Sequence, residues 1–188
     1  SQSIVESDVW LDELIAWAID NNIPDYYLEK GEYSDIWQGL PRNKIKLLEL
    51  TKLNLMSCHL NSLNPLIGKL TNLTHLNLWG NKLIEIPEFI GNLNNLTVLG
   101  LSQNQLTEVP ESIGNLINLT SLHLWGNKLS KIPSFIRNLN NLTVLGLSQN
   151  QLTEIPEFIG NLQNLTDLNL SSNQLNEIPK FIANLKNL

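Results

Sequence analysis

Apolar and polar residues alternate in a unit of 23 residues that fills most of the chain. The stretch from Leu96 to Glu108 returns letter for letter from Leu142 to Glu154. Six units therefore begin at residues 50, 73, 96, 119, 142 and 165, and residue 188 is the first of a seventh. A fixed period of this length indicates a repeat architecture, in which each unit stacks only on its neighbours.

Within each unit, the apolar positions predict a short strand, a turn and a return segment. In the second unit, Leu76 and Leu78 alternate with polar residues, as the two faces of a strand require. Leu83, Ile86 and Ile90 then continue the apolar set through a short helical or extended return. One unit buries too little apolar surface to offset its ordering entropy. We therefore expect the units to stack and to pair their strands into one parallel sheet.

Two further columns recur with the leucines: an asparagine after each strand and a proline at the start of each return segment. These residues are Asn81, Asn104, Asn127, Asn150 and Asn173, and Pro87, Pro110, Pro133, Pro156 and Pro179. An amide side chain has donors and an acceptor, so it can satisfy backbone groups that the turn buries. Proline lacks a backbone donor, which keeps the return segment out of the sheet. We interpret both columns as structural.

The consensus of the unit resembles that of a known repeat family. Written generically, it is L-T-x-L-x-L-x-x-N-x-L-x-x-I-P-x-x-I-x-N-L-x-N, and it is similar to the leucine-rich repeat pattern L-x-x-L-x-L-x-x-N/C-x-L. Cys58 replaces the asparagine of the first unit, which this pattern allows. The I-P-x-x-I-x-N-L half resembles the intracellular bacterial and plant variety, whose members usually serve as protein-recognition scaffolds. The resemblance implies an α/β solenoid with a curved parallel β-sheet on its concave side.

Residues 1–49 break the period and predict an α-helical N-terminal cap on the six repeats of residues 50–188. Residues 3–6 fit a capping box, and a second helix is expected to open at Pro41 and to run through Leu48. A loop or a short helical turn is expected across residues 26–37. Apolar residues at helical spacing are Val9, Trp10, Leu14, Trp17 and Ala18. Because a solenoid end exposes apolar core and an unpaired strand edge, we expect Trp10 and Trp17 to pack there rather than to form a binding stripe.

Net charge divides unevenly between these two segments. Residues 1–49 hold 4 basic and 10 acidic side chains, and residues 50–188 hold 8 of each, so the net charge of −6 lies in the first segment. Neither segment has the basic stripe that binds phosphate backbones, so we expect no nucleic acid partner. No apolar run is long enough to span a membrane, and no signal peptide is visible. Cys58, the single cysteine, favours a reducing compartment: the cytoplasm, or a host cytoplasm if the protein is a secreted effector.

Catalytic and metal chemistry have little support in the sequence. The Cys58-His59 pair has no spaced Cys/His set around it, and His75 and His123 lie on other repeats. A metal needs three or four converging ligands, and a thiolate nucleophile needs a placed base. No Gly-rich phosphate loop, paired carboxylates or Ser/His/Asp set is visible. We therefore expect no enzyme activity, no metal and no cofactor.

The residues between the inward-facing leucines predict a binding surface on the concave face. Trp79 and Trp125 flank Ser102, and strands about 4.8 Å apart would place the two rings roughly 10 Å apart. Gly100 and Ser102 would then leave a notch between the rings. In the alternative interpretation, both rings lie flat over neighbouring strands and are a by-product of repeat duplication. Exposed tryptophan is enriched in binding hot spots. The candidate binding residues are Met56, His75, Asn77, Trp79, Lys82, Gly100, Ser102, His123, Trp125 and Lys128.

These features predict a protein-binding module whose partner carries apolar anchors and an acidic residue, because Lys82 and Lys128 lie beside the rings. A glycan or small-ligand receptor is one alternative, since tryptophan with asparagine, histidine and glutamine also suits sugars. Another is the substrate-recognition part of a larger effector or enzyme that continues past Leu188. The last strand, near Leu168 and Leu170, has no visible cap, so we also expect end-to-end self-association through it.

Overall fold

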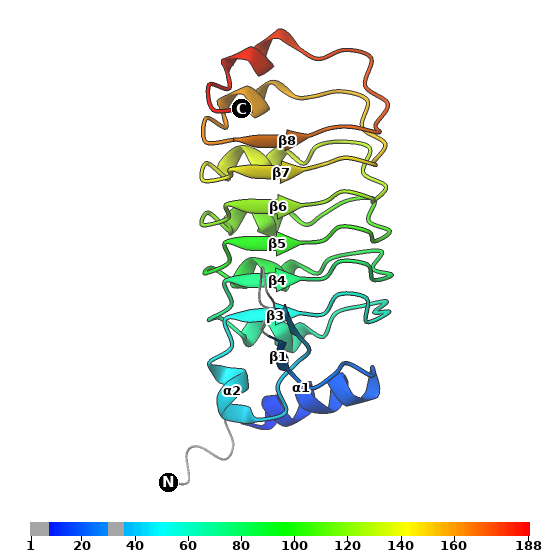
Figure 1. The fold of residues 1–188 in the computed structure, drawn as a ribbon, viewed down its shortest axis with the longest axis vertical. Helices are drawn as coiled ribbons and strands as arrows, with labels where there is room; N and C mark the ends of the chain where they lie inside the picture. The colour runs from blue at the N-terminus through cyan, green and yellow to red at the C-terminus, as the bar shows by residue number, and fades with distance from the viewer. Residues whose placement is uncertain (1–7, 30–35) are drawn as a thin grey trace.

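Parallel strands run through most of the computed structural model, which describes residues 8–29 and 36–188 (Figure 1). In these residues, one parallel sheet has six strands in sequence order. They are β3 (Lys52–Asn54), β4 (His75–Asn77), β5 (Val98–Gly100), β6 (Ser121–His123), β7 (Val144–Gly146) and β8 (Asp167–Asn169). Each strand pairs with the residues 23 positions later, so that Leu76 on β4 lies beside Leu99 on β5. The predicted solenoid with a parallel sheet is confirmed.

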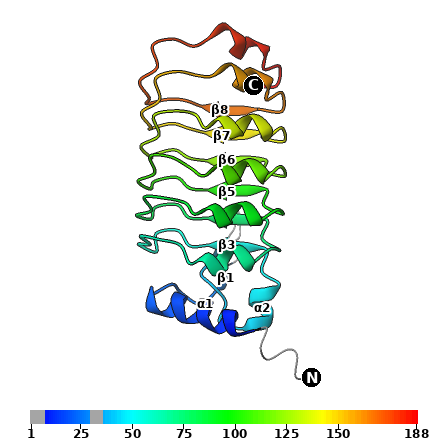
Figure 2. The same cartoon turned by 180° about the vertical axis from the view of Figure 1, so that it is seen from behind.

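Each repeat returns behind the sheet through a short 3-10 helix (Figure 2). These helices are η1 (Pro65–Lys69), η2 (Glu88–Asn92), η3 (Glu111–Asn115), η4 (Ser134–Asn138), η5 (Glu157–Asn161) and η6 (Lys180–Asn184). A proline occupies the N-cap of η2, for example, where Pro87 has a φ of −66°. The pyrrolidine ring presets this φ, and proline has no N–H to leave unpaired in the first turn. Of the two predicted forms of the return segment, the helical one is found.

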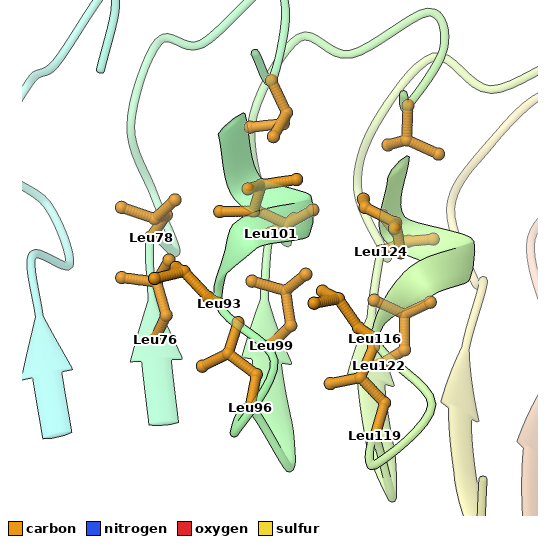
Figure 3. Close-up of a cluster of buried hydrophobic side chains, with 14 of the residues drawn as sticks. Leu76, Leu78, Leu93, Leu96, Leu99, Leu101, Leu116, Leu119, Leu122 and Leu124 are labelled. Carbon is orange, nitrogen blue, oxygen red and sulfur yellow. The ribbon is translucent and has the colours of Figure 1, made fainter. Parts of the chain in front are cut away.

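Leucine and isoleucine side chains form one continuous core between the sheet and the 3-10 helices (Figure 3). Leu76, Leu78 and Leu93 are buried, and the equivalent leucines of the next repeats stack beside them. Burying one such side chain contributes roughly 1.5–3 kcal/mol relative to leaving it in water. Because each leucine contacts the neighbouring repeat, the stack holds the concave face of the sheet in fixed register.

The asparagine column forms the predicted ladder between repeats. Asn104 donates from Nδ2 to the carbonyl oxygens of Leu101 (3.1 Å) and Leu78 (3.0 Å). Its Oδ1 accepts the backbone N–H of Leu83 at 3.0 Å. Asn104 thus ties its own repeat to the preceding one. The same three contacts are made by Asn81, Asn127, Asn150 and Asn173.

We expect the substitution Asn104→Ala to lower the free energy of unfolding by about 1–3 kcal/mol, because it leaves buried backbone groups unpaired. Urea denaturation followed by circular dichroism measures the change. Asn95→Ala is the matched control, since Asn95 is exposed and its amide donates to the Thr71 carbonyl at a site that water reaches. Equal effects of the two substitutions would contradict the structural role of the ladder.

The N-terminal segment covers the first repeat with helices α1 (Val9–Asp20) and α2 (Lys44–Leu48) (Figure 1). On these helices, Leu11 and Leu14 of α1 and Leu47 of α2 are fully buried. Trp10 and Trp17 are partly buried against the same core, as the packing interpretation predicts. The predicted capping box at residues 3–6 lies outside the described residues.

Two expectations for this segment are wrong in detail. The second helix begins at Lys44 rather than at Pro41, because the Asn43 side chain accepts the N–H of Lys46 at 3.0 Å and caps the helix there. In place of the predicted loop across residues 26–37, β1 (Tyr27–Glu29) and β2 (Ile36–Gln38) pair as antiparallel strands. Gly39, which follows β2, pairs with the edge of β3: its N–H donates to the Asn54 carbonyl at 2.9 Å. A side chain at Gly39, which has a φ of +92°, would collide with the carbonyls of Pro24 and Asp25.

At the other end, burial decreases along the last repeat. Leu145 and Leu147 of the fifth repeat are fully buried, but their equivalents Leu168 and Leu170 are only partly buried. Within the described residues, β8 pairs only with β7. An unpaired strand edge beside apolar side chains is a template for pairing with another chain.

We therefore expect this 188-residue chain to associate end to end as its concentration rises. Light scattering over a concentration series would show an increasing mean mass. Leu170→Lys places a charge beside the edge and should shift the equilibrium to the monomer. A constant monomer mass, together with slow amide exchange in the sixth repeat, would contradict this expectation.

Candidate functional site

A groove of about 500 Å³ lies on the concave face, over strands β3 to β6. Its lining residues are Trp37, Met56, His75, Leu76, Asn77, Trp79, Val98, Gly100, Ser102, His123 and Trp125. This volume lies within the range of about 300–1,000 Å³ that is common for sites enclosing a small molecule or a buried anchor. Eight of the ten candidate binding residues line the groove. Their role in binding remains a prediction.

Lys82 and Lys128 are the two candidates that do not line the groove. Both side chains are exposed, and each lies three residues after the tryptophan of its own repeat.

The two tryptophan rings lie closer together than the strand spacing implies. The ring centroids of Trp79 and Trp125 are 6.3 Å apart, and the ring planes are inclined by 44°. The predicted separation of roughly 10 Å, and the notch between the rings, are wrong. Ser102 is only 1% exposed, so it is buried and not open to solvent. The rings meet because contact removes apolar surface from water, and the small residue between them leaves room for it.

The hollow is lined by residues of β4, β5 and β6, with Val98 and Gly100 on β5, the strand that ends before Ser102. A Cβ atom at Gly100 would lie 3.0 Å from Oδ1 of Asn77. That oxygen accepts the backbone N–H of Trp79 at 3.0 Å and so fixes the start of the tryptophan wall. Glycine at position 100 therefore leaves room for the Asn77 side chain to accept the Trp79 N–H.

Two polar atoms of the groove are buried without a hydrogen-bond partner among residues 8–29 and 36–188. They are Nε1 of Trp79 and Oγ of Ser102. Buried polar groups are nearly always paired, and leaving one unpaired costs about 1–3 kcal/mol. The groove therefore holds unused hydrogen-bonding capacity under its tryptophan wall.

Trp37, which the sequence analysis did not select, forms the opposite wall. Its ring meets the His75 ring edge to face, with centroids 6.3 Å apart. The Trp37 carbonyl accepts from Nδ2 of Asn54 at 2.8 Å, and Nε2 of Gln38 donates to the Met56 carbonyl at 3.2 Å. These bonds fix β2 to the edge of the first repeat. One wall of the groove thus comes from the N-terminal segment.

The surroundings of the two histidines of the groove favour their neutral form. Burial lowers the pKa of His75, and the nearby Lys52 ammonium lowers it further. Burial also lowers the pKa of His123, an effect that the Asp167 carboxylate partly opposes. Since an unperturbed histidine has a pKa of about 6.5, both shifts favour the uncharged side chain at neutral pH. Among residues 8–29 and 36–188, no carboxylate lines the groove.

We expect stability to fall as the pH drops below about 6.5, the pKa of unfolded histidine. The folded pKa values of His75 and His123 are lower, so the unfolded chain binds more protons in this window and acid favours unfolding. Urea denaturation at several pH values between 7.5 and 5.5 gives the slope. The double substitution His75→Gln and His123→Gln should flatten it, and an unchanged slope would contradict the assignment.

The other sequence features give no sign of catalytic chemistry. Burial raises the pKa of the Cys58 thiol, which opposes the thiolate form that a nucleophile needs. The part of the chain that the structure describes contains no group of three or more His, Cys, Asp or Glu residues that could hold a metal ion. In the same part, none of the helices has the length and apolar character needed to cross a membrane.

A solenoid of stacked strand-and-3-10-helix units defines a class of repeat proteins, and comparison with protein families identifies which one. Residues 42–147 match the profile described as "Leucine-rich repeat region", and residues 140–188 match "Leucine Rich repeats (2 copies)". The chain belongs to the leucine-rich repeat family, whose members are typically non-enzymatic interaction modules. No curated protein matches it.

Solved structures of leucine-rich repeat proteins share the fold. A leucine-rich repeat protein of Leptospira interrogans is 44% identical over 77% of the chain, with a TM-score of 0.73. The ectodomain of the Arabidopsis thaliana receptor kinase GASSHO1/SCHENGEN3, in complex with Casparian strip integrity factor 2, is 35% identical over 80% of the chain, with a TM-score of 0.67. The PEPR1–AtPEP1 structure is 25% identical over 80% of the chain, with a TM-score of 0.64. The chain spans 37%, 19% and 25% of these three structures, respectively.

Proposed function

We propose that this chain binds a segment of a protein partner in the groove on its concave face. The observation that carries the proposal is the lining: three tryptophans from two walls enclose an apolar hollow on a rigid sheet. Tryptophan side chains bury a large area and are enriched in binding hot spots. An apolar anchor from the partner would remove these rings and Val98 from water.

The groove suits a protein segment better than a sugar. Each sugar hydroxyl that enters a buried site needs a hydrogen-bond partner, and the groove has few free polar atoms to supply one. Oδ1 of Asn77 is occupied by the N–H of Trp79, and Nδ1 of His75 lies 2.9 Å from the Thr74 hydroxyl. In the part of the chain that the structure describes, the groove lining includes no carboxylate that could accept hydroxyl protons. The glycan alternative therefore becomes an outcome of the test.

Charge around the groove favours an acidic residue next to the anchor. Nζ of Lys52 lies 5.9 Å from the Trp37 ring centroid, at one end of the groove. Lys82 and Lys128 are exposed on the turns that follow the two tryptophans. Among the residues of β3 to β8, Asp167 alone carries a carboxylate. It lies on β8, two strands beyond β6 and away from the groove lining. Opposite charge at the rim would steer the partner and fix its orientation.

Two of the similar structures are named as complexes, which supports a binding role for the shared fold. The partners named in those complexes are ligands of those two proteins, and the partner of this chain is sought by the selection experiment below.

Phage-displayed random peptides, selected in parallel on the wild-type protein and on a W79A/W125A variant, test the proposal. We expect enriched peptides with a large apolar residue that bind the wild type and fail to bind the variant. Phe158→Ala is the control, because it removes a partly buried aromatic ring from η5, behind the sheet. Peptides that bind the double variant equally well would contradict the proposal. So would a glycan array that gives ligands when peptide selection gives none.

A further inference from the structure

The unpaired atoms of the groove indicate what its occupant must carry. Ser102 is 1% exposed, and its Oγ has no hydrogen-bond partner within the described residues. Nε1 of Trp79 is buried and unpaired in the same way. An indole N–H can only donate, and a serine hydroxyl can donate as well as accept. One kind of group, a hydrogen-bond acceptor, therefore satisfies both atoms.

Among the described residues, neither atom has such an acceptor within hydrogen-bond distance. Oδ1 of Asn77 accepts the backbone N–H of Trp79, at 3.0 Å. The fifth repeat provides an internal comparison, because Ser148 occupies the position of Ser102 but Ser171 replaces the second tryptophan. Ser148 is not among the buried side chains without a partner. The two atoms without a partner thus occur where Trp79 and Trp125 together cover Ser102.

We propose that the occupant of the groove presents a carbonyl or carboxylate oxygen to Nε1 of Trp79 and Oγ of Ser102, next to an apolar side chain seated over Val98 and Gly100. This inference rests on the proposed function. A peptide supplies both parts in adjacent positions, since each residue carries its own carbonyl. The Lys52 ammonium, 5.9 Å from the Trp37 ring centroid, makes the surroundings favourable to an oxygen anion and unfavourable to an ammonium group.

The acceptor reaches these atoms when the two rings move apart. Trp79 and Trp125 are both partly exposed, and side chains at binding surfaces commonly change rotamer when a partner binds. The occupant then replaces the contact between the two rings with contacts to its own apolar side chain and oxygen.

Titration of the ¹⁵N-labelled protein with three small probes tests this inference by NMR. The probes are N-acetylphenylalanine, toluene and phenethylammonium, which share a phenyl ring and differ in acceptor and charge. The chain has five tryptophans, and the Trp79 indole resonance is the one that Trp79→Phe removes. We expect N-acetylphenylalanine to move this resonance downfield with a saturable curve. The other two probes should bind about tenfold more weakly or not at all.

Trp79→Phe keeps an aromatic ring and removes the indole N–H together with part of the ring system, a loss of ring area that Trp125→Phe shares. It should weaken the binding of N-acetylphenylalanine about tenfold and leave toluene unchanged. Trp125→Phe is the matched control and should preserve the preference for the acceptor, because Nε1 of Trp125 is not one of the unpaired atoms. The four remaining indole resonances of each variant report that it is folded.

Equal affinities for the three probes, full affinity in the Trp79→Phe variant, or no shift with any probe would overturn the inference. The proposed function fails by a different result, namely selected peptides that bind the W79A/W125A variant as well as the wild type. If those peptides need the tryptophans but Trp79→Phe binds them with full affinity, the groove binds by apolar contact and the acceptor inference alone is wrong.

Discussion

A chain that lacks residues 1–40 will be insoluble or will melt at a strongly lowered temperature. Leu11, Leu14 and Ala18 on α1 are fully buried, and the deletion removes them together with Leu40. Each large apolar side chain of this kind contributes roughly 1.5–3 kcal/mol by its burial. The deletion also exposes the edge of β3 and the core of the first repeat to water. In a solenoid, this loss removes a whole interface, and we expect a decrease in melting temperature on the order of 10 °C or more.

Point substitutions on α1 test the contribution of its packing without shortening the chain. Leu14→Ala removes a fully buried side chain of α1 and should lower the free energy of unfolding by about 2–5 kcal/mol. Ile19→Ala is the matched control on the same helix, where the side chain is 56% exposed, and it should change stability by less than about 0.5 kcal/mol. A truncated chain that stays monomeric and melts like the full-length chain would refute the role of this segment as a cap.

The second large effect is expected on binding. Trp79→Ala and Trp125→Ala should each weaken binding of a selected peptide by about 2 kcal/mol or more, or roughly 30-fold. Each substitution removes a wall of the groove that the apolar anchor would contact. The effect on stability should be smaller than that of Asn104→Ala, because both rings are only partly buried and a ring pair contributes about 0.5–1.5 kcal/mol. Thermal melting and isothermal titration of each variant measure the two quantities.

The double variant should lose less affinity than the sum of the single losses. The two rings touch, with centroids 6.3 Å apart, so removing one already disturbs the position of the other. Phe158→Ala should retain full affinity. If the tryptophan variants unfold as Asn104→Ala does, the rings are packing residues. If they fold and bind normally, the binding site lies elsewhere, and the acidic N-terminal segment is the next candidate.

The repeating part of the fold was predictable because its period fixes register. Once Leu76 and Leu99 occupy equivalent positions, their strands must pair side by side, and the residues between the leucines must face the concave side. The asparagine ladder follows from the same argument, since every repeat buries the same backbone groups at the same turn. Eight of the ten candidate residues meet in one groove for this reason.

The N-terminal segment has no period, and its structure was predicted less well. Nothing in the repeat pattern places Trp37, so its position as a wall of the groove was missed. Two short runs of aromatic and aliphatic residues flank Gly31 in the sequence, and this is the pattern of a hairpin. That signal would have predicted β1 and β2. It would not have placed Trp37 over the first repeat, because that depends on contacts such as the hydrogen bond from Asn54.

The separation of the tryptophan rings shows a second limit. Strand spacing determines where Trp79 and Trp125 leave the backbone, but it does not determine their side-chain torsions. The rings rotate toward each other because Ser102 is small and because contact buries apolar surface. Sequence spacing thus located the residues of the groove correctly and its open volume incorrectly.

Chemical-shift mapping of the protein with a peptide from the display selection tests the central claim most directly. If the groove is the binding site, the amide resonances of β4, β5 and β6 and the indole resonances of Trp37, Trp79 and Trp125 will change together at one saturation midpoint. Resonances of the 3-10 helices behind the sheet will stay in place. Changes confined to those helices, or to α1 and α2, with an unaltered groove, would contradict the claim.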